Sequence, residues 1–309
     1  MAEAIEGLFA SRPLARPRVM GILNVTPDSF YSGSRFLDLE EAVAQARRLV
    51  AEGAEILDIG GESTRPGSEP VGAQDEARRV LPLIARLSGL GVPLSIDTSK
   101  AEVARRALEA GASILNDVTA LSGDPAMPEV AGRYPAVILM HMQGRPRTMQ
   151  ESPCYQDVVA ELLAFFRGRL AAFEASGGEP RRVWIDPGIG FGKTLEHNLE
   201  IFRRLEEFQS LGRPIVLGAS RKSFLGLLAP GRSPLAPCPG LGAAPAPPSG
   251  APDLAAAPGA APLPPEARLE GSLAAACRAA EAGVEVVRVH DPAATRRALE
   301  AFAAMRRGG

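Results

Sequence analysis

The sequence predicts an α/β protein whose strands close into a (β/α)8 TIM barrel, within a single domain of residues 1–309. Short runs rich in Val, Ile and Leu alternate with longer stretches of helical periodicity, which is typical of a parallel sheet covered by helices. Eight such runs are present, as a closed barrel requires, whereas a doubly wound sheet commonly has about five to seven strands.

The predicted strands are short and almost continuously apolar, as expected of strands that are buried on both faces. They cover residues 19–25, 55–59, 93–98, 113–118, 136–142, 182–186, 214–220 and 284–290. The predicted helices lie between them and have apolar residues at three- and four-residue spacing. The clearest helices cover residues 40–51, 76–87, 101–110, 158–175, 195–208 and 268–283.

Residues 229–265 interrupt this alternation between the seventh strand and the helix that follows it. The segment consists almost entirely of Ala, Pro and Gly, and it has no apolar periodicity. Since each proline removes a backbone donor, we expect a disordered or polyproline-like insertion. A tolerated surface insertion is favoured over a lid, because long loops lose little stability.

Composition excludes several classes of protein. A chain of 309 residues that is 46% hydrophobic can bury one large core, and a net charge of −2 argues against a nucleic-acid partner. No apolar run is long enough to cross a membrane. Cys154, Cys238 and Cys277 are odd in number and widely spaced, which favours a reduced, cytoplasmic protein.

Polar residues follow nearly every strand, and the strand ends of such a barrel meet at one mouth. One group suits a flat heterocycle with amide and amino edges: Asp97, Asn116, Asp186 and Lys222. A second group, mostly donors, suits a phosphate: Asn24, Thr64, Arg288 and His290. The Asn24 oxygen could also bind Mg²⁺. A helix cap or a strand-end hydrogen bond explains any single Asp or Asn equally well, but not the whole series.

Other chemistries are less well supported. Residues 188–194 resemble the end of a Walker A loop, but position 187 is proline where that loop requires glycine. The chain has no Gly-x-Ser-x-Gly elbow, and its three histidines lack zinc spacing. We expect His197 to be structural, while His141 suits either the core or a supporting position beside the site.

Ordered motifs make the chain similar to the dihydropteroate synthase family. The longest are Met-Gly-Ile-Leu-Asn-Val-Thr-Pro-Asp-Ser-Phe at 20–30, Gly-Gly-Glu-Ser-Thr-Arg-Pro at 60–66 and Asp-Pro-Gly-Ile-Gly-Phe-Gly-Lys at 186–193. Shorter motifs stand at 95–98, 116–117, 141–144, 220–223 and 288–291. The resemblance runs from about residue 18 to the final helix, without the insertion, and its ordered motifs are together far more specific than any one alone.

The resemblance implies a folate-biosynthesis enzyme that condenses 6-hydroxymethyl-7,8-dihydropterin pyrophosphate with para-aminobenzoate, uses Mg²⁺ and forms a homodimer. It assigns a pterin pocket to Asp97, Asn116, Met140, Asp186, Phe191, Lys222 and Arg288. It assigns the pyrophosphate and Mg²⁺ to Asn24, Thr64, Arg288 and His290, and the aminobenzoate or a sulfonamide to Phe30, Pro66, Lys222 and Ser223. Two loops, 26–36 and 61–70, are expected to close over the pterin, with Arg65 among the substrate-binding residues.

The expected reaction is a dissociative displacement of pyrophosphate. Asp97 and Asp186 would favour the electron-poor pterin of the transition state, while Mg²⁺, Arg288 and His290 would stabilise the leaving group. Asp97, Lys222, Arg288 and His290 are therefore the predicted catalytic residues. Residues 31–34 read Tyr-Ser-Gly-Ser where the family usually has Ser-Asp-Gly-Gly. Because of this departure, a non-catalytic pterin-binding protein stays an alternative. A pterin-binding methyltransferase that acts on a corrinoid protein is a second alternative, because such enzymes share the barrel.

Overall fold

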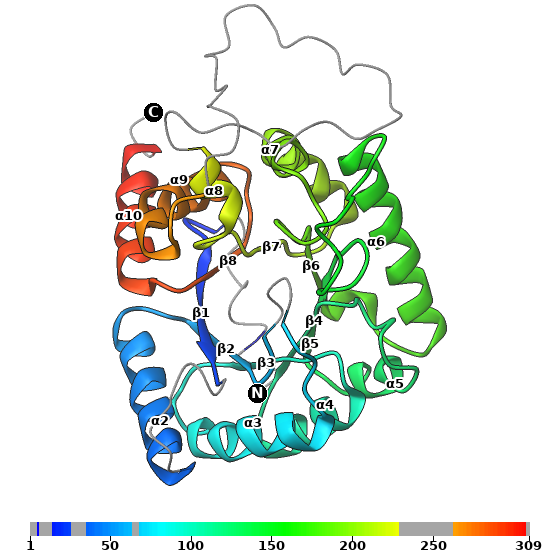
Figure 1. The fold of residues 1–309 in the computed structure, drawn as a ribbon, viewed down its shortest axis with the longest axis vertical. Helices are drawn as coiled ribbons and strands as arrows, with labels where there is room; N and C mark the ends of the chain where they lie inside the picture. The colour runs from blue at the N-terminus through cyan, green and yellow to red at the C-terminus, as the bar shows by residue number, and fades with distance from the viewer. Residues whose placement is uncertain (1–4, 6–13, 26–34, 64–67, 229–261, 307–309) are drawn as a thin grey trace, which may run out of the picture.

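Eight short parallel strands lie at the centre of the molecule, as the sequence predicts (Figure 1). The computed structural model describes residue 5 and residues 14–25, 35–63, 68–228 and 262–306. The strands are β1 (Arg18–Asn24), β2 (Ile56–Gly60), β3 (Leu94–Asp97), β4 (Ile114–Asp117), β5 (Ala136–Met140), β6 (Val183–Asp186), β7 (Val216–Leu217) and β8 (Val286–Val289).

The pairing of the strands closes them into a barrel. Every pair is parallel, and the order is β6-β5-β4-β3-β2-β1-β8-β7. A bridge between Ile185 and Ile215 closes the seam between β6 and β7, where Ile185 N donates to Pro214 O over 2.9 Å. The predicted (β/α)8 TIM barrel is confirmed.

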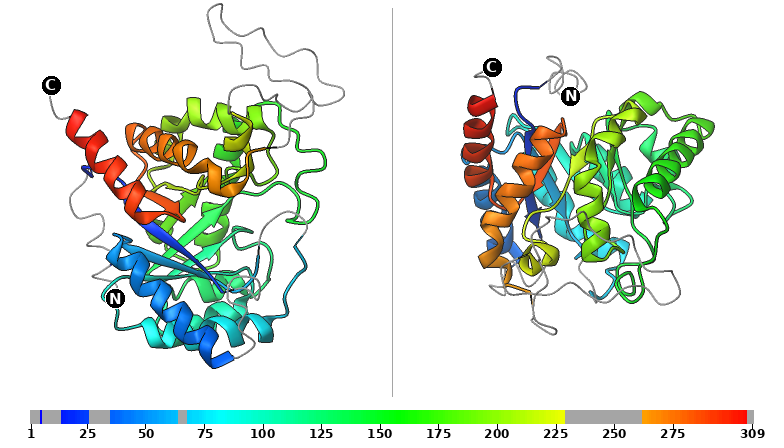
Figure 2. Two further views of the ribbon diagram at one scale, coloured as in Figure 1. Left: turned by 60° about the vertical axis from the view of Figure 1, so that its left-hand side comes forward. Right: turned by 90° about the horizontal axis from the view of Figure 1, so that it is seen from above.

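Helices surround the strands, as the views in Figures 1 and 2 show. The α-helices are α2 (Arg35–Ala51), α3 (Ala73–Leu87), α4 (Ala101–Ala110), α5 (Met127–Ala131), α6 (Val158–Ala175), α7 (Leu195–Arg203), α8 (Ser223–Leu227), α9 (Leu269–Glu281) and α10 (Pro292–Arg306). The 3-10 helices are η1 (Pro180–Arg182), η2 (Leu205–Leu211) and η3 (Pro265–Arg268). Two neighbours late in the chain, α9 and α10, pack side by side, and α10 also packs against β1.

Local signals in the sequence explain where several helices begin and end. Asp157 caps α6 by accepting from Ala160 N over 3.0 Å. Helix α4 ends at Gly111, whose φ of 116° suits a residue without a Cβ. A capping box opens α7, in which Thr194 accepts from His197 N and the His197 ring accepts from Thr194 N. The prediction that His197 is structural is confirmed.

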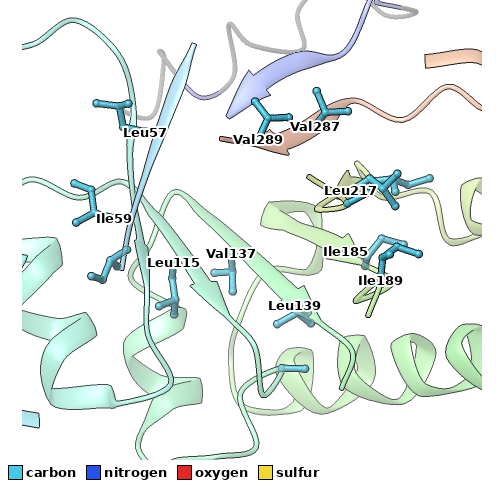
Figure 3. Close-up of a cluster of buried hydrophobic side chains, with 14 of the residues drawn as sticks. Leu57, Ile59, Leu115, Val137, Leu139, Ile185, Ile189, Leu217, Val287 and Val289 are labelled. Carbon is cyan, nitrogen blue, oxygen red and sulfur yellow. The ribbon is translucent and has the colours of Figure 1, made fainter. Parts of the chain in front are cut away.

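The outward faces of the strands form the main hydrophobic core with the helices. Figure 3 shows these side chains, which alternate along each strand with residues that face into the barrel. The labelled strand residues are Leu57, Ile59, Leu115, Val137, Leu139, Ile185, Leu217, Val287 and Val289, and the labelled Ile189 lies in the loop after β6. Because this layer fixes the register of each strand, it also fixes which residues face inward.

A second apolar cluster fills the interior of the barrel. Its members come from the inward faces of the strands, together with one residue of the N-terminal segment. They are Ile5, Met20, Ile56, Ile114, Ala136, Ile138, Trp184, Val216 and Val286. The barrel is therefore packed below its mouth, and the inward positions that follow along the strands carry the polar residues.

The main differences between the observed and the predicted elements are a shortened strand, a broken helix and two additional short helices. The predicted strand 214–220 is a strand only over Val216–Leu217, since only these two residues pair with β8. The predicted helix 195–208 breaks at Arg204, whose φ of −115° and ψ of 26° are not helical, and it continues as η2. The helices α5 and α8 were not predicted, since five residues are too few to show periodicity.

Two further predictions concern the insertion and the absence of membrane-spanning segments. Most of the predicted insertion, residues 229–261, lies outside them, so its disorder and the single domain of 1–309 stay predictions. Within the described ranges, no helix combines the length and the apolar character needed to cross a membrane.

Candidate active site

Inward-facing residues at the ends of β1 to β4 stand next to one another around the mouth of the barrel. Asn24 pairs with Gly60, Gly60 with Asp97, and Asp97 with Asn116. A Cβ placed on Gly60 would lie 3.5 Å from Asn24 Oδ1 and 3.7 Å from Asp97 Cβ. Gly60 thus leaves a gap between these two polar side chains, and all four residues share one face.

Arg288 of β8 crosses the mouth and joins this row to two carboxylates. Its Nε donates to Asp58 Oδ2 over 2.5 Å, and its Nη2 donates to Asp97 Oδ2 over 2.8 Å. Asn116 Nδ2 donates to the same Asp58 oxygen over 3.1 Å. Four strands that are far apart in sequence therefore contribute to one hydrogen-bonded network.

Burial changes the acidity of this network. It raises the pKa of Asp97 to about 7, although the charge of Arg288 opposes the change. Burial by itself would lower the pKa of Arg288, but the charges of Asp58 and Asp97 raise it beyond its usual range. Arg288 therefore stays a cation, whereas Asp97 can change its charge near neutral pH.

Asp186 and Lys222 form the other side of the mouth. A Cβ on Gly218 would lie 3.7 Å from Asp186 Oδ2 and 3.8 Å from Arg288 Cβ, so Gly218 separates Asp186 from the Arg288 network. Burial raises the pKa of Asp186, against the charge of Lys222 and the N–H that Gly188 donates to it. Burial lowers the pKa of Lys222 to about 7, and the charge of Asp186 opposes this.

Lys222 also contacts the loop that follows β6. Its Nζ lies 4.4 Å from the centroid of the Phe191 ring and donates to Ile189 O. Phe191 thus presents an aromatic ring beside the polar groups of the mouth. Acceptors for N–H groups, a donor for a carbonyl or ring nitrogen and an aromatic ring together suit a flat, polar heterocycle.

The motif at 220–223 is held to the end of β8. Ser220 Oγ accepts from His290 N over 3.1 Å and lies 3.1 Å from His290 Nδ1. Arg221 has a φ of 58°, which is strained for a residue with a side chain, and it makes a two-point ion pair with Asp291. These contacts fix the turn that carries Lys222.

The remaining predicted residues take different places. Met140 is buried at the end of β5, in register with Asp186, and Ser223 is exposed as the first residue of α8. Phe30, Thr64, Arg65 and Pro66 lie outside the described residues. The structure therefore brings Asn24, Asp97, Asn116, Met140, Asp186, Phe191, Lys222, Arg288 and His290 to one end of the barrel.

Not every polar strand end belongs to the site. Asp117 accepts from Thr119 N and Leu121 N, and it stabilises a turn in which Ala120 and Leu121 have positive φ. Asp117 therefore stabilises a turn, which is the common alternative to a functional role for a polar residue at a strand end.

Sequence reasoning missed Asp58, which holds both Arg288 and Asn116. The available signal was the alternation of β2, where Ile56 lies in the interior cluster and Asp58 must share its inward face. It also left His141 undecided. His141 is buried, and its Nδ1 lies 3.0 Å from Lys193 Nζ, so it supports the loop after β6.

A charged cluster lies beside the mouth, at the loop after β2. Lys100 Nζ donates to Glu76 Oε2 over 2.5 Å and also to Glu62, while Glu62 Oε1 accepts from Val71 N over 2.9 Å. Ser68 Oγ donates to Ser63 O across the same loop. These contacts hold both flanks of residues 64–67, whose predicted roles concern the substrates.

The described residues at the mouth of the barrel offer few protein ligands for a metal ion. Within the described ranges, no three His, Cys, Asp or Glu side chains gather in a way that would hold a metal ion. Asn24 Oδ1 faces the gap above Gly60, and it is a hard oxygen ligand. One such ligand fits Mg²⁺, which often keeps waters and binds mainly through substrate phosphates.

Comparison with known proteins gives one consistent result. A family model described as pterin binding enzyme matches residues 20–290. Dihydropteroate synthase of Escherichia coli (strain K12) is 41% identical over 288 residues, which cover 92% of this chain and 91% of that protein. Dihydropteroate synthase of Synechocystis is 41% identical over 278 residues, covering 89% and 86%.

Solved structures of Xanthomonas albilineans dihydropteroate synthase are similar to the whole barrel. The structure with 4-aminobenzoic acid has a TM-score of 0.79 at 42% identity, covering 95% of this chain and 94% of that one. The structure in complex with 7,8-dihydropteroate has a TM-score of 0.75 at 40% identity, covering 95% of each chain.

Proposed function

Since the chain belongs to the pterin-binding enzymes and, among them, to the dihydropteroate synthases, we propose that the mouth of its barrel is the active site of the dihydropteroate synthase reaction. The enzyme forms 7,8-dihydropteroate from a pterin and 4-aminobenzoate. The network that joins Asp58, Asp97, Asn116 and Arg288 carries the proposal, because it places acceptors, donors and a cation in one mouth.

The pterin substrate is the 6-hydroxymethyl-7,8-dihydropterin pyrophosphate ester. The bond between its methylene carbon and the pyrophosphate oxygen breaks, and the amine nitrogen of 4-aminobenzoate bonds to that carbon. Pyrophosphate leaves with the bonding electron pair, and the amine proton passes to pyrophosphate or solvent. The displacement is dissociative, because the electron-rich dihydropterin stabilises positive charge on the carbon before the weak amine attacks.

Asp97, Asn116, Asp186 and Lys222 bind the pterin. The two carboxylates accept from pterin N–H groups, and they stabilise the ring more strongly as it becomes electron-poor in the transition state. Asn116 both donates and accepts, and Lys222 donates to a carbonyl or ring nitrogen. Phe191 and Met140 cover the pterin ring. The Phe191 ring centroid lies 4.4 Å from Lys222 Nζ, and this closeness to a proposed pterin-binding group supports its role.

Arg288 and His290 bind the departing pyrophosphate, together with Thr64 and Arg65 of the second loop. Arg288 is oriented by Asp58 and Asp97, which is the rigidity that electrostatic stabilisation of a leaving group requires. Mg²⁺ would be held by Asn24 and by substrate phosphate oxygens, and it would supply charge neutralisation at the leaving group.

The aminobenzoate lies against Phe30, Pro66, Lys222 and Ser223, so sulfonamides compete with it at the same place. Ser223 is exposed at the first turn of α8, which supports access from solvent. We further propose a homodimer acting in the cytoplasm. Light scattering of the purified protein tests the dimer, and a monomeric mass at micromolar concentration contradicts it.

A direct assay tests the function. Purified protein is mixed with pterin pyrophosphate, 4-aminobenzoate and Mg²⁺, and dihydropteroate and pyrophosphate are quantified. Equal amounts of both products are expected, and chelation of Mg²⁺ should abolish their formation. Pterin pyrophosphate binding without turnover contradicts the proposal and would instead support a non-catalytic pterin-binding protein.

Asp97→Asn tests the proposed role of the carboxylate. The amide keeps the shape but removes the charge that stabilises the electron-poor pterin, so kcat should fall about 100-fold or more. Steady-state kinetics with saturating substrates measures it. An unchanged kcat would refute this role for Asp97.

A further inference from the structure

The loop from Gly188 to Gly192, between β6 and α7, has a backbone that is held almost entirely by side chains. Gly188, Gly190 and Gly192 all have positive φ, a backbone conformation that glycine adopts without strain. Each of its five carbonyls accepts from a side chain: Gly188 O and Phe191 O from Lys193 Nζ, Ile189 O from Lys222 Nζ, Gly190 O from Gln150 Nε2, and Gly192 O from Tyr155 OH.

Lys193 lies at the centre of this arrangement. It is only 3% exposed, and its Nζ lies 3.0 Å from Gly188 O, 3.1 Å from Phe191 O and 3.0 Å from His141 Nδ1. An ammonium group donates to all three acceptors, and a neutral amine donates to the carbonyls and accepts from the ring. Burial lowers the pKa of His141 to about 3, so its ring is neutral and fits either arrangement.

Two residues, Phe191 and Gly188, connect the Lys193 amine to the proposed pterin pocket. Phe191, whose carbonyl it holds, places its ring 4.4 Å from Lys222 Nζ. Gly188, whose carbonyl it also holds, donates its N–H to Asp186 Oδ1 over 2.8 Å. The backbone is tightly confined here, since a Cβ on Gly188 would lie 1.8 Å from His141 O.

A phosphate-binding role for this lysine does not fit. The motif resembles the end of a Walker A loop, in which the lysine reaches a phosphate. Here its Nζ is buried behind the loop, where three protein acceptors surround it. Burying an amine without such acceptors would be unfavourable, so its position matches a supporting role.

We propose that Lys193, oriented by His141, is a positioning residue that holds the loop from Gly188 to Phe191 so that Phe191 and Asp186 meet the pterin. The inference rests on the proposed pterin site and adds a residue that supports it from behind. Its consequence is specific: loss of the amine weakens the pterin side of the site, while the aminobenzoate side is affected less.

Lys193→Met tests this, because it keeps an unbranched stem of nearly the same length and removes the amine. Calorimetry should show the Kd for pterin pyrophosphate raised about 10-fold or more, and kinetics should show the KM for 4-aminobenzoate within about 2-fold of the parent. Arg181→Met is the control and should change neither, because this exposed cation lies in η1, at the opposite end of β6 from the loop.

A double-mutant cycle separates positioning from general destabilisation. If Lys193 acts through Phe191, then Lys193→Met should weaken pterin binding far less in a Phe191→Ala background than in the parent. The effects of Lys193→Met and Asn116→Ala should instead multiply, because Asn116 lies on β4, two strands from β6, and is held by Asp58. Multiplying effects with Phe191→Ala would overturn the proposal, as would an unchanged Kd in Lys193→Met.

His141→Phe serves as the second variant if Lys193→Met does not fold. It keeps a ring against Phe165, whose centroid lies 4.7 Å from that of His141, and it removes Nδ1. The Kd for pterin pyrophosphate should rise in the same direction by a smaller factor, and an unchanged Kd overturns the proposal. Failure of the parent itself to bind pterin pyrophosphate would overturn both this inference and the proposed function, whereas binding without turnover affects only the latter.

Discussion

Asp58 illustrates how one buried carboxylate can organise a site without being expected to contact substrate. It accepts from Arg288 and Asn116 with the same oxygen, and its side chain is fully buried. Removing it would leave Arg288 with Asp97 alone and would free the guanidinium to move. Small displacements of groups that bind a transition state have large effects on rate.

Asp58→Ala should therefore lower kcat/KM about 100-fold, which steady-state kinetics measures. Ser95→Ala is the matched control, since Ser95 pairs with Asp58 across β2 and β3 and its buried Oγ has no hydrogen bond among the described residues. It should keep kcat/KM within about 2-fold. Equal losses in both variants would show that the barrel interior, rather than the Arg288 contact, is responsible.

The pKa values of Asp97 and Lys222 predict a narrow pH optimum. Burial raises the first to about 7 and lowers the second to about 7. Below that pH Asp97 gains a proton and loses the charge that the pterin needs; above it Lys222 loses its proton and its charge. The rate constant kcat/KM should thus fall on both sides of about pH 7.

Lys222→Arg provides the check on this assignment, since a guanidinium keeps its charge throughout. The alkaline fall of kcat/KM should disappear in this variant while the acid fall remains. A profile of the parent that stays flat from about pH 6 to about pH 8 is incompatible with the two buried groups titrating as described.

At the scale of elements, the strands were the most predictable feature. All eight appear near their predicted positions, because β-branched and aliphatic runs buried on both faces leave a strong signal. The break at Arg204 and the short α5 and α8 escaped prediction, because one non-helical residue or a five-residue helix leaves no periodicity to recognise.

The residues of the polar site also divide into those that the sequence predicts and those that it does not. Residues at strand ends, such as Asp97 and Asp186, could be assigned to one mouth because barrel topology brings strand ends together. The alternation of β2 could have placed Asp58 on the inward face, but its contact with Arg288, like that of Lys193 with His141, joins residues more than 50 positions apart. Sequence spacing carries no information on such contacts.

The loop after β2 depends on an ion cluster that joins β2, α3 and α4. Glu76 is fully buried and pairs with Lys100, which also binds Glu62. Lys100→Met would leave a buried carboxylate without its cation, and it should lower the free energy of unfolding by about 3 kcal/mol in urea titration. Adding Glu76→Gln should restore part of that loss; no restoration would mean that the packing of the lysine stem matters instead.

At the scale of the whole molecule, the described segments on either side of residues 229–261 contact each other. Leu263 N donates to Gly226 O over 3.4 Å, and α8 packs against η3. Replacing residues 232–258 with about four Gly and Ser residues should leave kcat/KM within about 2-fold of the parent, as loop length has little effect on stability. A large rise in KM for either substrate would favour the lid.

A crystal structure with bound 7,8-dihydropteroate tests most directly whether the strand ends form one pterin site. The pterin ring should lie within about 2.7–3.2 Å hydrogen-bond distance of Asp97, Asn116, Asp186 and Lys222, with the aminobenzoate extending toward Ser223. A ring bound outside this group, with these four side chains still in contact only with protein or water, would contradict the account.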